Sequence, residues 1–155
     1  MEVTFDLINL KIPIMNTITL FIAILFMQQM FPQEYDTTTI TVVIENLENN
    51  EGAVMASMYS EETFLKGKGN YNSEAKIVDG KATLTFENVP AGIYGIIAFH
   101  DANSNNQMDF DANGMPIENY GISNNKFNPY GPPLWDDAKF EVSGEPLEFE
   151  INLTR

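Results

Sequence analysis

An aspartate- and asparagine-rich stretch beginning at Asp101 has the spacing of a cation-binding loop. Its oxygen-bearing side chains alternate along the chain, and a further acid follows at the ninth position, giving the set Asp101, Asn103, Asn105 and Asp109. Alternation matters because ligands two residues apart can converge on one ion. Gln107, at the seventh position, would offer its backbone carbonyl. Asn106 stands where such loops usually need glycine, and asparagine tolerates the positive φ of that turn.

The motif then restarts at Asp109, which would belong to both turns. The second copy places Asp111 and Asn113 at alternating positions and has Gly114 at the turn. Neither copy has glutamate at its twelfth position, and no flanking helices are expected, so the pattern is not an EF-hand. It is closer to the helix-free D-x-D-x-D-G-x-x-D loops of extracellular proteins. Acids farther along the chain could complete the ligand set, namely Glu118, Asp136 or Asp137.

We expect the ion to be Ca²⁺, because Mg²⁺ demands stricter octahedral geometry and retains several waters. The predicted metal ligands are Asp101, Asn103, Asn105, Gln107, Asp109, Asp111, Asn113 and Glu118. The alternative is a surface loop in which the asparagine and aspartate side chains satisfy their own backbone without metal.

The residue inventory argues against catalysis. Cysteine is absent, which excludes thiol nucleophiles, disulfides and thiolate zinc sites. His100 is the only histidine, and a single histidine at the end of an expected strand is more often a packed, hydrogen-bonded residue than a general base. No nucleophile elbow accompanies it. We therefore expect a protein that is not an enzyme.

The charge of the chain excludes other partners. With 22 acidic and 8 basic residues, its net charge is −14 at pH 7. Nucleic acid and anionic lipid would be repelled, because binding to phosphate needs clustered lysine and arginine. Cations are more natural partners, although solubility alone explains such acidity equally well.

The first 33 residues read as a signal peptide or N-terminal hydrophobic leader. Thr17 to Met27 is almost wholly apolar, with Lys11 before it and glutamines after it. A membrane-spanning helix needs about twenty apolar residues, whereas signal-peptide cores have roughly 7–15. A retained N-terminal anchor is the alternative. We expect residues 34–155 to form a single extracytoplasmic domain, periplasmic or secreted, with no membrane span once the leader is removed.

After the leader, hydrophobic residues recur with the period of two that is typical of half-buried strands. Asp79-Gly80 is a strong two-residue hairpin signal, and the run from Ile93 to His100 is apolar on both faces, as in a central strand. Seven strands are expected: Thr39–Glu45, Val54–Met58, Glu74–Val78, Lys81–Glu87, Ile93–His100, Lys139–Val142 and Leu147–Thr154. The sequence thus predicts an all-β, antiparallel, seven-stranded β-sandwich of Greek-key type.

One stretch interrupts this strand spacing. Residues Asp101 to Asp137 lack clear periodicity and are rich in asparagine, aspartate, glycine and proline. Loops of such length in compact domains are usually functional or disordered. The aromatic residues of this stretch argue against disorder.

Several motifs in this half of the chain resemble those of the domain-of-unknown-function 2141 family of exported bacterial proteins. They are F-H-D-x-N at Phe99, G-x-P-x-E-x-Y-G-x-S-N-N from Gly114 to Asn125, G-P-P at Gly131, and the A-x-F-x-V strand from Ala138. The likeness extends from about Thr39 to Leu153. The Pro-Ala-Gly-Ile-Tyr approach to the central strand is also similar to transthyretin-like sandwiches, which supports the fold. The family supplies no established activity.

Two functions therefore compete at this level. The first is a calcium-binding domain that acts as a binding or scaffold module. The second is a carbohydrate-binding or cell-surface polymer-binding module that uses Tyr120, Tyr130 and Trp135 as stacking platforms. Its partner would be a polysaccharide or a surface protein. Exposure separates the two, because a stacking platform must face solvent whereas a structural aromatic is buried.

Overall fold

The computed structural model describes residues 36–45 and 47–154. The predicted leader, residues 1–33, lies outside these residues. The described chain forms eight strands and one short helix: β1 (Thr37–Ile44), β2 (Ala53–Tyr59), β3 (Tyr71–Lys76), β4 (Ala82–Pro90), β5 (Gly92–Asp101), β6 (Tyr120–Ile122), α2 (Trp135–Ala138), β7 (Lys139–Val142) and β8 (Leu147–Glu150).

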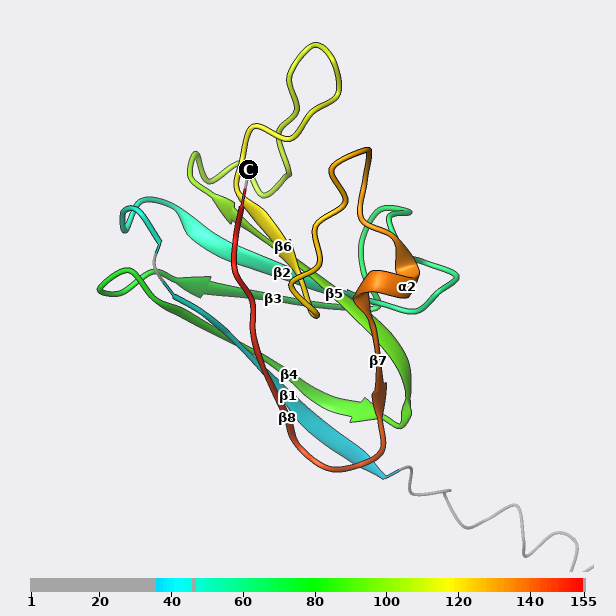
Figure 1. The fold of residues 1–155 in the computed structure, drawn as a ribbon. Helices are drawn as coiled ribbons and strands as arrows, with labels where there is room; N and C mark the ends of the chain where they lie inside the picture. The colour runs from blue at the N-terminus through cyan, green and yellow to red at the C-terminus, as the bar shows by residue number, and fades with distance from the viewer. Residues whose placement is uncertain (1–35, 46, 155) are drawn as a thin grey trace, which may run out of the picture. The chain divides into compact units, whose positions relative to one another are not determined.

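The strands form two layers (Figure 1). One sheet has three strands in the order β4-β1-β8, and the other has five, in which β3-β2-β5-β6 is the main path and β7 also pairs with β5. β6 pairs with Ile97–Phe99 of β5 and β7 with Gly92–Gly95, so the two short strands follow one another along the same edge of β5. The all-β sandwich prediction is confirmed.

The period-two pattern of the sequence gives the core. Alternate residues of β1, β2 and β4 are at most 2% exposed and meet between the sheets, namely Ile40, Val42, Ile44, Val54, Ala56, Met58, Ala82, Leu84 and Phe86. Val89, Ile96 and Ile151 complete this core. Burying each of the larger side chains (valine, leucine, isoleucine, methionine and phenylalanine) contributes about 1.5–3 kcal/mol, which holds the two sheets together. None of the helices in the described part of the chain is long and apolar enough to cross a membrane.

Three details of the sandwich differ from the sequence prediction. There are eight strands, because β6 lies inside the stretch expected to be a loop. One pairing is parallel, since β8 runs alongside β1 in the same direction, with Val42 opposite Phe149. The sequence of a four-residue strand does not show whether it pairs in parallel or antiparallel with a strand that is distant in the chain.

The third difference concerns the Asp79-Gly80 turn. It forms as predicted, with φ of 52° and 73° and paired hydrogen bonds between Val78 and Lys81. It does not join two strands of one sheet, however, because β3 pairs with β2 whereas β4 pairs with β1. Ile77, just before the turn, is buried where the chain passes between the layers.

Candidate functional site

The Asp/Asn loop starts at the last residue of β5 and extends beyond the ends of β5 and β6 (Figure 1). Asp101 is only 1% exposed, which is unusual for a carboxylate. Gly52, which precedes β2, lets the backbone of Asp101 approach closely. A Cβ atom on Gly52 would lie 1.9 Å from the Asp101 carbonyl oxygen, and the φ of Gly52 is +66°. This close approach fixes the base of the loop, and the motif by itself did not reveal it.

The Asp101 carboxylate organises the first turn. Its Oδ1 accepts a hydrogen bond from the backbone N–H of Asn105 at 3.1 Å, and its Oδ2 accepts one from Asn106 at 2.8 Å. Asn106 has φ of 60°, as predicted from its place in the motif. A glycine is not needed, because asparagine adopts this conformation at modest cost.

The two middle asparagines contact Asp109. Asn103 Nδ2 donates to Asp109 Oδ2 at 2.6 Å, and Asn105 Nδ2 donates to both carboxylate oxygens at 3.0 and 2.9 Å. Their Oδ1 atoms accept backbone N–H groups, from Asn105 in the first case and from Gln107 in the second. The first turn thus wraps around the Asp109 carboxylate.

Glu118 reaches the same place from the other side of the loop. It is 8% exposed, and its Oε2 accepts a hydrogen bond from the Asp109 N–H at 3.2 Å. Its Oε1 is buried and has no hydrogen-bond partner among the described residues. Burial raises the pKa of Glu118, and the charges of Asp101 and Asp109 raise it further, while the N–H groups of Asp109 and Ala102 act in the opposite direction.

No basic side chain balances these acids in the part of the chain that the structure describes. The ion pairs there join Lys81 to Glu45, and two further lysines to Asp136 and Asp137, all away from this loop. Nor are three of the described acids or histidines grouped closely enough to hold a metal as they stand. A cation would therefore need amide or backbone oxygens as well, and a small contraction of the loop.

Asp111 and Asn113 are not brought to this cluster. The Asp111 Oδ1 accepts hydrogen bonds from the N–H groups of Asn113 at 2.8 Å and Met115 at 2.9 Å. These bonds lower the pKa of Asp111, which is exposed. Gly114, with φ of +79°, completes a tight hairpin turn. The second copy of the motif thus supports its own backbone, as in the metal-free alternative.

The remaining candidates have other partners. Gln107 is exposed and donates its backbone N–H to Asn105. Asp136 pairs with Lys139, which lowers the pKa of Asp136 by hydrogen bonding and by charge. Asp137 pairs with Lys126 at 3.3 Å. Neither distant acid belongs to the cluster.

His100 is 7% exposed, and its Nε2 lies 2.7 Å from the carbonyl oxygen of Glu51. Since a carbonyl can only accept, the histidine donates from Nε2. This is the packed, hydrogen-bonded histidine that the sequence favours over a general base.

The three aromatic residues of the carbohydrate hypothesis differ in their surroundings. Trp135 packs against Phe64, with ring centroids 5.4 Å apart, and lies against Gly95. It belongs to a small hydrophobic cluster and is not a free platform. Tyr130 is 96% exposed, and Tyr120 lines a pocket, so these two remain accessible.

Comparison with known proteins gives the family and little more. None of the curated proteins matches the chain. Two crystal structures of the pilus-presented adhesin Spy0125 (Cpa) share 13% and 11% identity over 76% and 80% of this chain, both with a TM-score of 0.26. The chain spans only 27% of that adhesin. The family model described as "Uncharacterized protein conserved in bacteria (DUF2141)" matches residues 42–150, and the chain therefore belongs to this family.

Proposed function

We propose that this chain is an exported calcium-binding domain that acts as a binding or scaffold module and does not catalyse a reaction. The observation that carries the proposal is the buried Oε1 of Glu118, which has no hydrogen-bond partner among the described residues. A buried polar atom without a partner costs about 1–3 kcal/mol. A cation between Glu118, Asp101 and Asp109 would remove that cost and the mutual repulsion of the acids.

The available donors are those that calcium prefers. They are carboxylate and amide oxygens, and the loop from Asp101 to Glu118 contains no histidine or cysteine. Ca²⁺ accepts six to eight oxygen ligands in flexible geometry, whereas Mg²⁺ needs near-ideal octahedra. A loop that must contract to bind its ion suits the less demanding cation.

We assign the ion to one site, held by Asp101, Asn103, Asn105, Asp109 and Glu118, with the Gln107 carbonyl in the seventh position of the motif. Metal binding requires the Asn103 and Asn105 amides to present oxygen where they now present N–H to Asp109. The Asp111 turn is structural in this proposal, because Asp111 is exposed and has no buried carboxylate beside it, whereas Asp101 is buried and Glu118 reaches the first turn through Asp109.

Calorimetric titration of the full-length protein with Ca²⁺ tests the proposal. We expect one ion per chain with a dissociation constant of roughly 10⁻⁴–10⁻³ M, as in extracellular modules. Asp109→Asn should weaken binding at least about tenfold, which corresponds to about 1.4 kcal/mol. Asp111→Asn is the matched control and should bind as the unmodified protein does. Absence of binding, or equal loss in both variants, would overturn the assignment.

Export is the second part of the proposal and is supported by the apolar leader and the cysteine-free, acidic body. Cell fractionation with a C-terminal tag should recover the protein outside the cytoplasm. Replacing Ile24 and Leu25 of the leader by arginine should retain it inside. Recovery of both forms in the cytoplasm would contradict export while leaving calcium binding untouched.

A further inference from the structure

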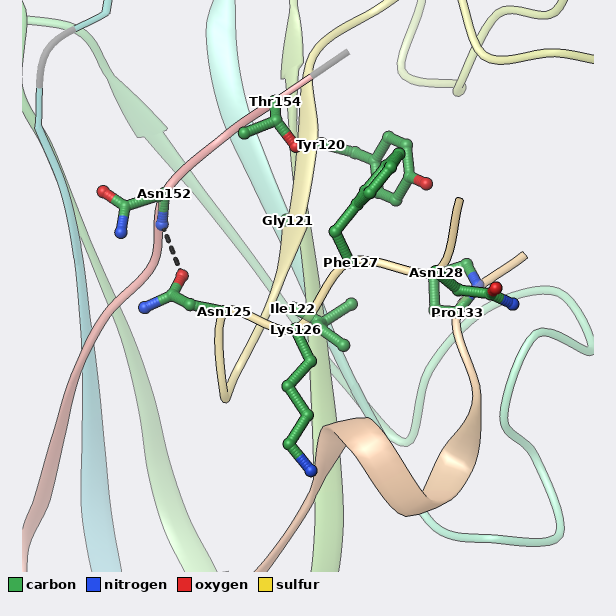
Figure 2. Close-up of a pocket in the computed structure, with 10 residues that line it drawn as sticks. All are labelled: Tyr120, Gly121, Ile122, Asn125, Lys126, Phe127, Asn128, Pro133, Asn152 and Thr154. Atoms are coloured by element: carbon green, nitrogen blue, oxygen red, sulfur yellow. Dashed lines mark hydrogen bonds between the residues drawn. The ribbon is translucent and has the colours of Figure 1, made fainter. Parts of the chain in front are cut away.

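A pocket of about 100 Å³ lies beside β6, on the far side of this strand from its pairing with β5. It is bounded by β6, by the loop that follows β6, and by the C-terminal segment after β8 (Figure 2). For scale, an engineered cavity of about 150 Å³ holds one benzene ring. The pocket is smaller and open to solvent, so a six-membered ring would lie against its wall and not be enclosed, and the rest of a ligand would remain outside.

The walls of the pocket include two aromatic rings. Figure 2 shows the side chains of Tyr120 and Phe127 on the same side of β6, with Pro133 nearby. Phe127 is 57% exposed and belongs to neither hydrophobic cluster among the described residues. Its exposure is thus not explained by packing, whereas Trp135, not far along the chain, is held by Phe64.

Polar groups border the same pocket. Asn152 and Thr154 make their hydrogen bonds within the described chain through backbone atoms, to Asn125 and Tyr120 respectively. The Asn152 amide and the Thr154 hydroxyl are both on exposed residues. Figure 2 shows the Asn152 amide on the opposite side of β6 from the two rings, so the Thr154 hydroxyl, which can both donate and accept, is the group available to a ligand hydroxyl.

Charge is scarce at the pocket, although the protein is strongly acidic. None of the lining residues is Asp or Glu, and the single lysine, Lys126, pairs with Asp137 at 3.3 Å. A net charge of −14 repels anionic ligands. The pocket therefore favours a neutral ligand with one apolar face and several hydroxyls.

The loop bordering the pocket holds a second aromatic platform. Asn128 accepts a hydrogen bond from the Tyr130 N–H at 3.1 Å and donates to the Pro132 carbonyl at 2.9 Å. These bonds brace the turn that carries Tyr130, which is 96% exposed. A braced, exposed tyrosine is suited to stacking at low entropic cost.

We propose that this pocket binds one ring of a neutral polysaccharide, with Phe127 and Tyr120 against the ring and the Thr154 hydroxyl hydrogen-bonding one of its hydroxyls. Tyr130 contacts the part of the polymer that remains outside. This site shares no residue with the proposed calcium site and does not depend on it. Its residues differ from the set expected from sequence, because Phe127 takes the place of Trp135.

The test uses full-length ¹⁵N-labelled protein and neutral tetrasaccharides of glucose, xylose, mannose and N-acetylglucosamine at millimolar concentration. At least one should shift the amide signals of Gly121, Ile122 and Phe127. Phe127→Ala should weaken binding at least about tenfold. This loss lies within the range of about 1–3 kcal/mol found when an aromatic side chain that stacks on a nucleic-acid base is replaced by alanine. Phe110→Ala is the matched control, since Phe110 is equally exposed, at 57%, on a different loop.

Two results would overturn the proposal. One is the absence of shifts with every tetrasaccharide, or shifts that fall elsewhere on the protein. The other is equal weakening by Phe127→Ala and Phe110→Ala, which would indicate nonspecific hydrophobic contact. If an apolar peptide shifts the same amide signals and no sugar does, the pocket belongs to a protein partner and the proposal is wrong.

Discussion

Replacing Glu118 with glutamine should stabilise the calcium-free protein. Glu118 is buried, its Oε1 has no partner among the described residues, and the charges of Asp101 and Asp109 act against its ionised form. Glutamine has nearly the same shape. Its oxygen can keep the hydrogen bond from the Asp109 N–H, and its neutral amide is not repelled by the charges of Asp101 and Asp109.

The expected gain follows from the cost of an unsatisfied buried group, about 1–3 kcal/mol. Because glutamine removes the buried charge but leaves a polar group in the same place, only part of this cost is recovered, and we expect a gain of about 1–2 kcal/mol. For a domain of this size, 1 kcal/mol shifts the melting temperature by about 4 °C. The calcium-free variant should therefore melt about 4–8 °C above the unmodified protein.

Calcium should remove this advantage. At ten times its dissociation constant, the ion adds about 1.4 kcal/mol to the unmodified protein through linkage. The variant lacks one charged ligand and should gain much less. Melting curves of both proteins in chelator and in millimolar calcium measure the two effects. Glu148→Gln, an exposed change on β8, should alter neither curve by more than about 0.5 kcal/mol.

A variant that melts lower than the unmodified protein in chelator would refute this reasoning. Glu118 would then be a stabilising acceptor of backbone hydrogen bonds and not a carboxylate in need of a cation. An unchanged response of Glu118→Gln to calcium would separately remove Glu118 from the metal site.

Three further outcomes are expected. Asn103→Asp should remove a hydrogen-bond donor to Asp109 and so lower the calcium-free stability by about 1 kcal/mol. Because it adds a charged ligand, it should raise calcium affinity about tenfold. Melting curves and calorimetry measure the two effects, and a higher melting temperature of the calcium-free variant would contradict the prediction. Gly52→Ala should cost more stability than Gly67→Ala: both glycines have positive φ, a strain of about 1–2 kcal/mol for alanine, but only Gly52 meets a backbone atom, at 1.9 Å. Because the pKa of Glu118 is raised, the folded state binds its proton more tightly than the unfolded state does, and this proton stabilises the fold at low pH but no longer does so once the pH rises through the folded pKa. Calcium competes with the same proton, so calcium affinity should fall on acidification from pH 7. A calcium affinity that calorimetry finds independent of pH would argue against the assignment.

Much of the sandwich could be predicted from local pattern, because the side-chain period of a strand depends only on neighbouring residues. Every residue predicted to face inward on β1, β2 and β4 is buried. β6 was missed because three residues are too few to show a period, and it exists only through pairing with β5 and the backbone hydrogen bonds between Tyr120 and Thr154. Sheet membership on either side of the Asp79-Gly80 turn also depends on distant partners.

Residue types and their spacing were enough to predict the chemistry of the candidate metal site, with alternating oxygen donors, an asparagine able to take positive φ, and a shared Asp109. It could not separate the two copies of the motif, because both have the same spacing. The two copies differ in the folded chain, since β5 buries Asp101 and the loop returns Glu118 to the first turn, whereas Asp111 is exposed and supports its own hairpin. Burial and the meeting of distant carboxylates are properties of the folded chain, and they separate the proposed metal site from a turn that supports its own backbone.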